Sequence, residues 1–172
     1  MHEKVAAIVK NLSGHARPGD RQSAQAVDVD TRLRDALAMA NRSQLGDKLT
    51  IIEKFGQVPP VPGKPEEIQQ AFFNIIRNGI QAMHGNGTLT LESRYENPGV
   101  VVKISDTGTG IPQEHLNKIF DPFFTTKDPD EGEGLGLYVV QQTLARNGGT
   151  IAVDSRDGAG TVFTMTFRAA TK

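Results

Sequence analysis

Asp106 is the residue whose surroundings most directly suggest chemistry. It stands in the stretch SDTGTGIP (residues 105–112), which follows a run of alternating apolar residues, and Gly108 and Gly110 come soon after it. Glycine adopts positive φ and lets the backbone approach a ligand closely. The carboxylate could therefore act as an acid catalyst or accept a hydrogen bond from a ligand. A third interpretation is structural, since an aspartate before glycine commonly caps its own turn.

A second cluster, GEGLGL (residues 132–137), precedes a run with helical spacing. Unpaired backbone N–H groups and the positive end of the helix dipole make a glycine-rich helix start suitable for phosphate. The cluster lacks the lysine of a phosphate-binding P-loop, and it follows an acidic loop instead of a hydrophobic strand, which argues against a dinucleotide fold. By itself it is equally compatible with a solvated loop.

Two asparagines, Asn74 and Asn78, lie one helical turn apart in the strongly apolar stretch FNIIRNGIQAM (residues 73–83). A buried amide requires a hydrogen-bonding partner, so two amides on one ridge predict a polar site beside the core. An amide oxygen also suits Mg²⁺, which binds one or two protein oxygens beside phosphate and keeps most of its waters. The opposing interpretation places both amides on the solvent face.

The composition is that of an ordinary globular domain. Of the 172 residues, 37% are hydrophobic and 23% are charged, which suits one domain with a sizeable core. The net charge of -1, without any basic block, argues against binding nucleic acid or anionic membranes by bulk charge. The absence of cysteine excludes disulfides and thiolate chemistry. No apolar run approaches the roughly 20 residues of a membrane span, and the first residues are too charged for a signal peptide. A cytoplasmic chain is expected.

The amino-terminal part is predicted to contain two helices. The first carries an apolar stripe that a Pro-Gly pair ends within residues 1–19. Residues 20–27 are polar and small, which is typical of a linker. The second helix covers residues 31–47, with Asp30 or Thr31 as its N-cap and Gly46 as its stop.

The remainder is predicted to alternate between strands and helices. The expected strands are residues 49–55, 88–95, 100–105, 150–155 and 161–167. The expected helices are residues 65–83, with Pro65 in the first turn, a short one from Pro112 to about Phe120, and one from Leu135 that Gly148 and Gly149 close. A Pro/Gly-rich loop at residues 57–65, whose Pro65 suits the first helical turn, and an acidic loop at residues 121–134 are also expected. Tight turns join consecutive strands, so the pattern predicts an α/β two-layer sandwich with a mixed, mostly antiparallel sheet packed on helices.

Five segments, taken in order, resemble the signature boxes of the histidine-kinase catalytic domain. They are FNIIRNGIQAM, VKISDTGTGIP, IFDPFFTTK, GEGLGLYVV and GAGTVFTMTF, and they run through about residues 72 to 167. The resemblance implies the Bergerat-type ATP-binding fold, which gyrase, heat-shock chaperone and mismatch-repair ATPases share, with ATP and Mg²⁺ bound among the boxes. Residues 1–19 resemble the end of the second dimerisation helix of such kinases, which leaves residues 20–172 as the catalytic domain.

The resemblance also implies roles for single residues. Asp106 would accept a hydrogen bond from the adenine amino group, where guanine offers a carbonyl that a carboxylate repels. Asn78 matches the asparagine that holds Mg²⁺, and Asn74 matches its partner one turn earlier. Hydrolysing relatives place a glutamate at position 74, so this chain is expected to hold ATP for transfer and to hydrolyse it poorly. The other residues that match the nucleotide site, its lid and its aromatic anchors are Gly108, Gly110, Ile111, Phe120, Phe124, Lys127, Gly132, Gly134, Leu135, Gly136, Leu137 and Thr161.

Three positions depart from the pattern of the family. Gly79 stands where alanine is usual, which costs roughly 0.5 to 1 kcal/mol of helix preference. Gln81 replaces a residue that is often charged, so a phosphate contact from this position is in doubt. Glu133 replaces a commoner threonine and adds to an acidic lid, which opposes a triphosphate unless Lys127 and Mg²⁺ compensate.

The phosphoacceptor box of these kinases is absent from the sequence. Its four histidines, His2, His15, His84 and His115, have neither metal-ligand spacing nor the acid-following motif of an acceptor. The resemblance therefore predicts the catalytic fragment of a longer kinase, whether or not the parent is anchored to a membrane. Its partners would be the parent's own dimerisation helices, which carry the acceptor histidine, and the receiver domain of a response regulator.

Three alternatives stand beside this interpretation. A serine kinase of the anti-sigma type has similar boxes, although the amino-terminal helix favours a histidine kinase. A nucleotide-binding pseudokinase module would result if Gly79 and the acidic lid weaken ATP binding. The triplet Asp106-Thr107-Gly108 also occurs in retroviral-type proteases, but these need two aspartates that share a proton and an all-β chain, which the helix-rich pattern contradicts.

Overall fold

The computed structural model of the chain describes residues 24–44, 48–124 and 136–170. Three features predicted from the sequence lie outside these ranges: the first helix within residues 1–19, the helix stop at Gly46, and most of the acidic loop that leads to the last helix.

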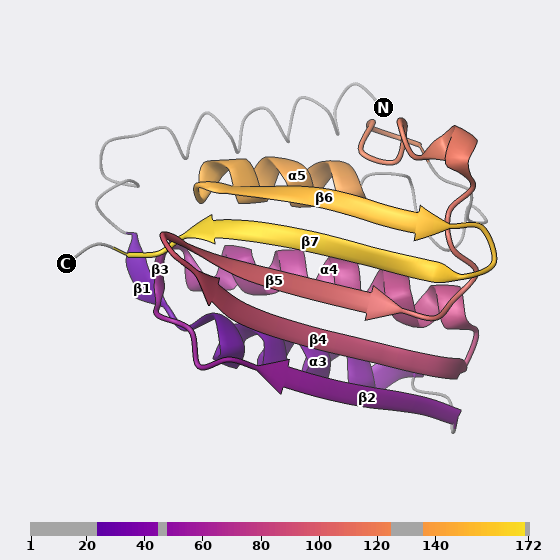
Figure 1. Cartoon of the computed structure of the whole chain (residues 1–172), viewed down its shortest axis with the longest axis horizontal. Helices are drawn as coiled ribbons and strands as arrows, with labels where there is room; N and C mark the ends of the chain where they lie inside the picture. The colour runs from indigo at the N-terminus through magenta and orange to yellow at the C-terminus, as the bar shows by residue number, and fades with distance from the viewer. Residues whose placement is uncertain (1–23, 45–47, 125–135, 171–172) are drawn as a thin grey trace.

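Within the described residues, five strands form one mixed sheet (Figure 1). They are β2 (Lys48–Phe55), β4 (Asn86–Glu96), β5 (Gly99–Asp106), β6 (Gly149–Arg156) and β7 (Gly160–Arg168). Their order across the sheet is β2-β4-β5-β7-β6, with β2 parallel to β4 and every other neighbouring pair antiparallel. Four of these strands extend slightly beyond both predicted ends and β2 only at its start, and the predicted mixed, mostly antiparallel sheet is confirmed.

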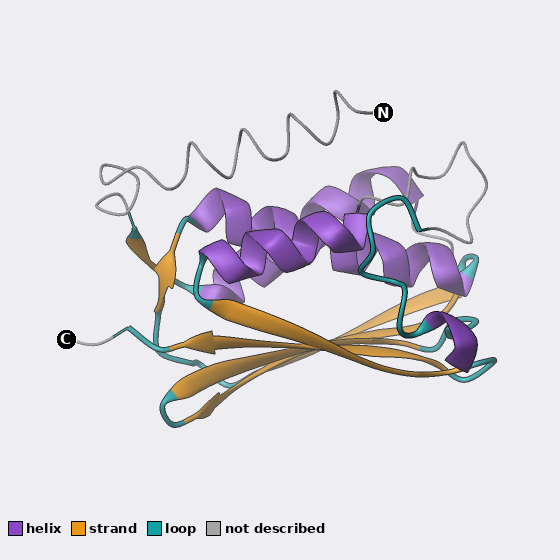
Figure 2. Ribbon diagram, turned by 90° about the horizontal axis from the view of Figure 1, so that it is seen from above, coloured by secondary structure: helices purple, strands orange, loops and turns teal. Residues whose placement is uncertain are grey.

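Three α-helices of the described part cover one face of this sheet (Figure 2). They are α3 (Val29–Gln44), α4 (Pro65–Met83) and α5 (Gly136–Arg146). The apolar core lies between the two layers, where α4 buries residues such as Phe72 and Ile76 against strand residues such as Ile104 and Met165. The α/β two-layer sandwich expected from the sequence is therefore confirmed.

Helix α4 runs through the middle of the helical layer, and local chemistry determines both of its ends. Pro65 occupies the first turn, where its missing N–H would have no helical partner. At the other end His84 takes the left-handed conformation, with a φ of 52°, and its N–H bonds to the carbonyl of Gln81. Between these ends, apolar residues at helical spacing fill the buried face.

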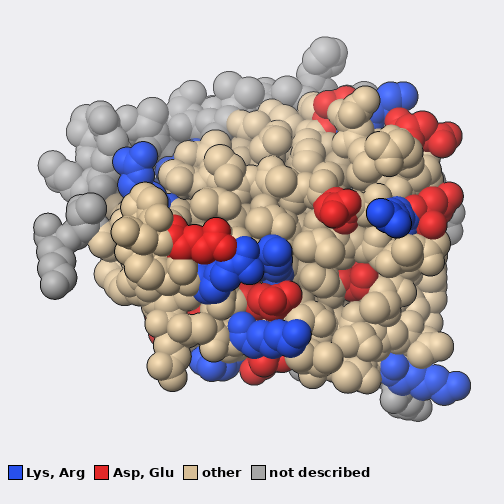
Figure 3. Space-filling view, viewed as in Figure 1, with Lys and Arg blue, Asp and Glu red and all other residues tan. Residues whose placement is uncertain are grey.

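The open face of the sheet carries charged side chains of both signs (Figure 3). Basic and acidic groups lie interspersed on this face and do not separate into patches of one sign. Arg94 and Glu96, for example, form an exposed ion pair on β4. This face therefore offers no basic surface of the kind that attracts nucleic acid. Among the described residues, no helix is long and apolar enough to cross a membrane.

Two short strands form where the sequence predicted irregular chain. β1 (Gln25–Val27) lies in the predicted linker, and β3 (Val61–Gly63) lies in the predicted Pro/Gly-rich loop. They pair antiparallel, with Val27 opposite Val61, and both valines are buried in the core. A segment of three residues is too short to show a period of two, so its strand character depends on the tertiary partner.

The start of α3 also differs from the prediction. The helix begins at Val29, and Asp28, not Asp30 or Thr31, precedes it. The Asp28 carboxylate accepts a hydrogen bond from the Thr31 hydroxyl in the first turn at 2.8 Å. Asp30 is buried instead and accepts a hydrogen bond from Ser93 on β4 at 2.5 Å. The predicted helix after Pro112 is likewise shorter, a 3-10 turn η1 (Gln113–His115) followed by further turns.

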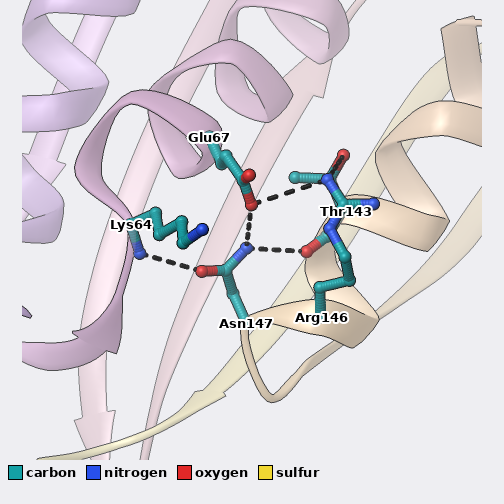
Figure 4. Close-up of polar contacts among 5 residues, drawn as sticks. All are labelled: Lys64, Glu67, Thr143, Arg146 and Asn147. Carbon is teal, nitrogen blue, oxygen red and sulfur yellow. Dashed lines mark hydrogen bonds and ion pairs between the residues drawn. The ribbon is translucent and has the colours of Figure 1, made fainter. Parts of the chain in front are cut away.

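A polar network joins α4 to α5 at one end of the sandwich (Figure 4). Asn147, which follows α5, accepts a hydrogen bond from the Lys64 amide at 2.9 Å. Its own amide donates to the Glu67 carboxylate at 3.0 Å and to the Thr143 carbonyl at 2.8 Å. The first turn of α4 is thereby fixed to the last turn of α5.

Candidate functional site

The opposite end of the sandwich brings together most of the site residues predicted from the sequence. At this end lie the carboxyl-terminal half of α4, the end of β5 with the loop after it, the start of β7 and the start of α5 (Figure 1). The sequence-predicted residues on these elements are Asn74, Asn78, Asp106, Gly108, Gly110, Ile111, Gly136, Leu137 and Thr161.

Asp106 is the last residue of β5, and its side chain is turned toward the helices. It is 9% exposed, and its Oδ1 accepts a hydrogen bond from the Gly108 amide at 2.8 Å. Burial raises the pKa of the carboxyl to about 6, against the opposing effect of the backbone N–H groups of Gly108 and Thr161. At neutral pH the group is therefore an ionised hydrogen-bond acceptor in a mostly dry environment. Asp106 thus caps its own turn and is also a buried hydrogen-bond acceptor.

Asn74 and Asn78 are both half-buried. This lies between the two positions considered from the sequence, a polar site beside the core and the solvent face. The oxygen of Asn74 accepts a hydrogen bond from Gln70 at 3.4 Å. Ala82 lies one turn after Asn78 on the same helical ridge, and its carbonyl accepts a hydrogen bond from the Thr109 amide at 3.2 Å. The ridge with the two amides therefore ends directly beneath the glycine loop that follows Asp106.

Gly108 and Gly110 allow this loop to lie close to its neighbours. A Cβ on Gly108 would stand 2.6 Å from the carbonyl oxygen of Ala82. Gly110 has a φ of 74°, and a Cβ there would overlap the carbonyl of Arg156 in the β6–β7 hairpin. In the structure both glycines thus serve contacts within the protein, while their proximity to adenine stays a prediction.

Ser155 is a site residue that the sequence reasoning missed. It lies on β6, is 6% exposed, and accepts a hydrogen bond from the Ile111 amide at 2.7 Å. The signal was present in the strand TIAVDS, because the period of two places Ser155 on the same face as Ile151 and Val153. A polar residue on an otherwise apolar strand face needs buried partners.

The aromatic residues predicted as lid anchors pack at the edge of the core. Phe120 and Phe124 are partly buried against it, as are Ile111 and Leu137. The ring of His115 meets Phe124 edge-on, with a centroid separation of 5.4 Å. Gly136 is the first residue of α5, whereas Lys127, Gly132, Gly134 and Leu135 lie outside the described residues.

The described residues contain no group of three or more His, Cys, Asp or Glu side chains that could hold a metal ion by themselves. Asn78 offers an amide oxygen at a half-buried position next to Gly79. This donor suits Mg²⁺, which needs only one or two protein oxygens when phosphate and water supply the others.

The sequence and the fold both match known proteins. Residues 63–171 match the family described as histidine kinase-, DNA gyrase B-, and HSP90-like ATPase. The sensor histidine kinase ZraS of Escherichia coli (strain K12) is 34% identical over 167 residues, which cover 95% of this chain and 35% of that protein. The chain thus spans about a third of the length of ZraS.

Two solved structures show the same fold. The nucleotide-free catalytic domain of histidine kinase ThkA matches with a TM-score of 0.75 at 26% identity, covering 85% of this chain and 95% of that chain. Full-length ShkA in complex with AMPPNP matches with a TM-score of 0.74 at 25% identity, covering 87% of this chain and 32% of that chain. This chain belongs to the family of histidine kinase-, DNA gyrase B- and HSP90-like ATPases, as an ATP-binding catalytic domain of the histidine kinase type.

Proposed function

We propose that this domain binds ATP with Mg²⁺ and presents the γ-phosphate to a histidine on the dimerisation helices of its parent kinase. The observation that carries the proposal is Asp106, a buried and ionised acceptor on the family's adenine-reading position. A buried carboxylate is costly unless hydrogen bonds satisfy it, and the adenine amino group would add a donor to the backbone N–H groups of Gly108 and Thr161.

The site residues take the following roles in this proposal. Asp106 reads the adenine amino group, and Thr161 lies beside it on the neighbouring strand. Asn78 would hold Mg²⁺ with Asn74 one turn earlier, and Gly132, Gly134 and Gly136 would be the phosphate-binding glycines of the lid. Phe120 and Phe124 anchor the lid. Lys127 is the one basic residue in the sequence of the acidic loop at residues 121–134.

The chemistry asked of the protein is to position ATP and to exclude water. Bound Mg²⁺ would neutralise charge on the phosphates. Asn74 has no useful basicity, so no side chain at this position activates water, which favours transfer over hydrolysis. The backbone N–H groups at the start of α5 provide a positive helix end for an anion.

The wider organisation is part of the same proposal. Residues 1–19 would be the end of the second dimerisation helix, and residues 20–172 the catalytic domain. The phosphoryl group would pass from the acceptor histidine to the receiver domain of a response regulator. The described residues show no spanning helix, which suits a cytoplasmic domain whether or not the parent kinase is anchored to a membrane.

A calorimetric titration tests nucleotide binding directly. The chain is titrated with ATP and separately with GTP, each with and without Mg²⁺. Saturable binding of ATP that GTP does not reproduce, and that Mg²⁺ strengthens, is the expected result. Failure to bind either nucleotide would instead identify a non-catalytic module.

The transfer step is tested in the full-length parent. With labelled ATP, the wild-type kinase should acquire an acid-labile label of the kind that phosphohistidine carries, and Asn78→Ala should prevent this. An acid-stable label would point to a serine kinase and contradict the proposed acceptor.

A further inference from the structure

Ser155 and Thr161 carry the buried hydroxyl groups of the candidate site. They lie opposite each other on β6 and β7, and they are 6% and 5% exposed. Their oxygens are 2.8 Å apart, a separation at which either could donate the hydrogen bond. Which of them donates decides what Thr161 presents to a ligand.

The other contacts of Ser155 settle this direction. Its oxygen accepts from the Ile111 amide at 2.7 Å, and its proton points to the Gly160 carbonyl, 2.9 Å away, which cannot donate. A serine hydroxyl has one proton and two lone pairs. Because the proton is used on Gly160, the hydrogen bond between the hydroxyls is donated by Thr161. All bonding capacity of Ser155 is then filled.

The consequence for Thr161 is that its hydroxyl acts only as an acceptor toward other groups. Its proton is held by Ser155, and its burial keeps bulk water from supplying an alternative partner. Asp106 lies opposite Thr161 across the β5–β7 pair, on the same face of the sheet. At neutral pH both side chains therefore present lone pairs and no proton.

We infer that Ser155 is a positioning residue for base selection, because it holds Thr161 as a second acceptor beside Asp106. This inference rests on the proposed binding of ATP. Where both acceptors face the six position, they favour a purine with an amino group there, which donates, over one with a carbonyl, which only accepts. When Ser155 is absent, the Thr161 proton is released and can be donated to that carbonyl.

The test compares ATP with inosine triphosphate, which carries a carbonyl in place of the six-amino group. Calorimetric dissociation constants are measured at pH 7.5 with Mg²⁺ for the wild-type chain and for Ser155→Ala. The expected result is a fall of about three- to ten-fold in the preference for ATP, the range that one redirected hydrogen bond accounts for. A merely structural role would weaken both nucleotides equally and leave the preference unchanged.

Matched variants make the test specific. In a Thr161→Val background, Ser155→Ala should produce no further change in preference, because no hydroxyl is left to redirect. Ser155→Cys repeats the test with a side chain of similar size and weak hydrogen bonding. Thr164→Val, on the opposite face of β7, should leave the preference at the wild-type value.

The outcomes separate this inference from the proposed function. Wild-type binding of ATP together with an unchanged preference in both Ser155 variants would overturn the role of Ser155 alone. The role of Ser155 would also be overturned if Ser155→Ala changed the preference for ATP over inosine triphosphate equally in the wild-type and the Thr161→Val backgrounds. A wild-type chain that binds neither nucleotide would overturn both proposals.

Discussion

Gly79 on α4 lies directly against Asp106 on β5. A Cβ built on Gly79 would stand 3.3 Å from both Cβ and Oδ2 of Asp106, and 3.2 Å from Cδ1 of Leu89. Glycine at this position therefore leaves the carboxylate room that the usual alanine would narrow. The departure from the family pattern at Gly79 thus affects Asp106, the residue proposed to bind the adenine amino group, in addition to the helix.

Gly79→Ala is expected to stabilise the fold by less than the usual helix-propensity gain. That gain is roughly 0.5 to 1 kcal/mol, but the methyl group must displace Asp106 or Leu89 by a few tenths of an ångström. Urea denaturation measures the change in the free energy of unfolding. Ala38→Gly, at an exposed position of α3, calibrates the propensity term. If Gly79→Ala raised the free energy of unfolding by as much as Ala38→Gly lowers it, the added methyl group would cause no steric conflict with Asp106.

Asp106→Ala is expected to weaken ATP binding by about 1.5 to 3 kcal/mol, the usual value of a hydrogen bond to a charged group. Calorimetry with ATP measures the difference. Asp154→Ala, which removes an exposed carboxylate from β6, serves as the control and should leave the affinity nearly unchanged. Equal affinities of Asp106→Ala and the wild-type chain would remove the adenine assignment.

The raised pKa of Asp106 predicts opposite pH dependences of stability and binding. Between its ordinary value of 3.8 and about 6, the folded chain binds more protons at this residue than the unfolded chain. The free energy of unfolding therefore falls as pH rises through this window, by up to about 3 kcal/mol in all. In the proposed function Asp106 binds ATP as an ionised acceptor, so the affinity for ATP should decrease as pH falls below about 6.

Asp106→Asn provides the control for both dependences. The difference in unfolding free energy between wild type and Asp106→Asn, measured from pH 4 to 8, isolates this group from the other carboxylates. A difference that does not change across this range would contradict the raised pKa.

Gly110→Ala is expected to destabilise the chain much more than Gly158→Ala. Both glycines have positive φ, 74° and 82°, so alanine is strained at either position. A Cβ on Gly158 meets nothing within 4 Å, whereas one on Gly110 overlaps the Arg156 carbonyl. Thermal unfolding of the two variants separates backbone strain, about 1 to 2 kcal/mol, from the steric overlap. Similar melting temperatures would show that the loop can move away from the hairpin at little cost.

Asn147→Ala tests the network that joins α4 to α5. The substitution removes the hydrogen bonds to Lys64, Glu67 and Thr143, and a loss of about 1 to 3 kcal/mol is expected. Glu67→Gln keeps an oxygen for Asn147 but loses the ion pair with Arg146 at 3.5 Å, so it should cost less. Denaturation of both variants by urea gives the comparison. A larger loss for Glu67→Gln would assign the stabilisation to the ion pair instead.

Long periodic segments could be predicted from the sequence, whereas short ones could not. Helix α4 and the strands of the main sheet carry enough residues to show periods of 3.6 or two, and they were predicted closely. β1 and β3 depend on Val27 and Val61 meeting across the chain, which no local pattern reveals. Asp30 resembled a cap by residue type, but its buried partner Ser93 is 63 positions away in the sequence.

The candidate site shows the same limit. The resemblance to the histidine-kinase boxes predicted that Asn78, Asp106 and Thr161 belong to one site, and the elements that carry them meet at one end of the sandwich. The contact between Gly79 and Asp106 and the bonds of Ser155 depend on how distant elements pack. A sequence motif gives the residue types of a site but does not predict which of their atoms are in contact.

The pairing of β1 with β3 also determines where the chain enters its described part. These strands lie at the end of the sandwich opposite the tip of β5 (Figure 1). Helix α4, with 19 residues, separates the two ends by about 28 Å at 1.5 Å per residue. A group carried on the chain before Gln25 would have to span about that distance to reach Asp106, which takes at least about eight residues of extended chain. The number of residues before Gln25 thus limits which groups carried on that part of the chain could reach Asp106.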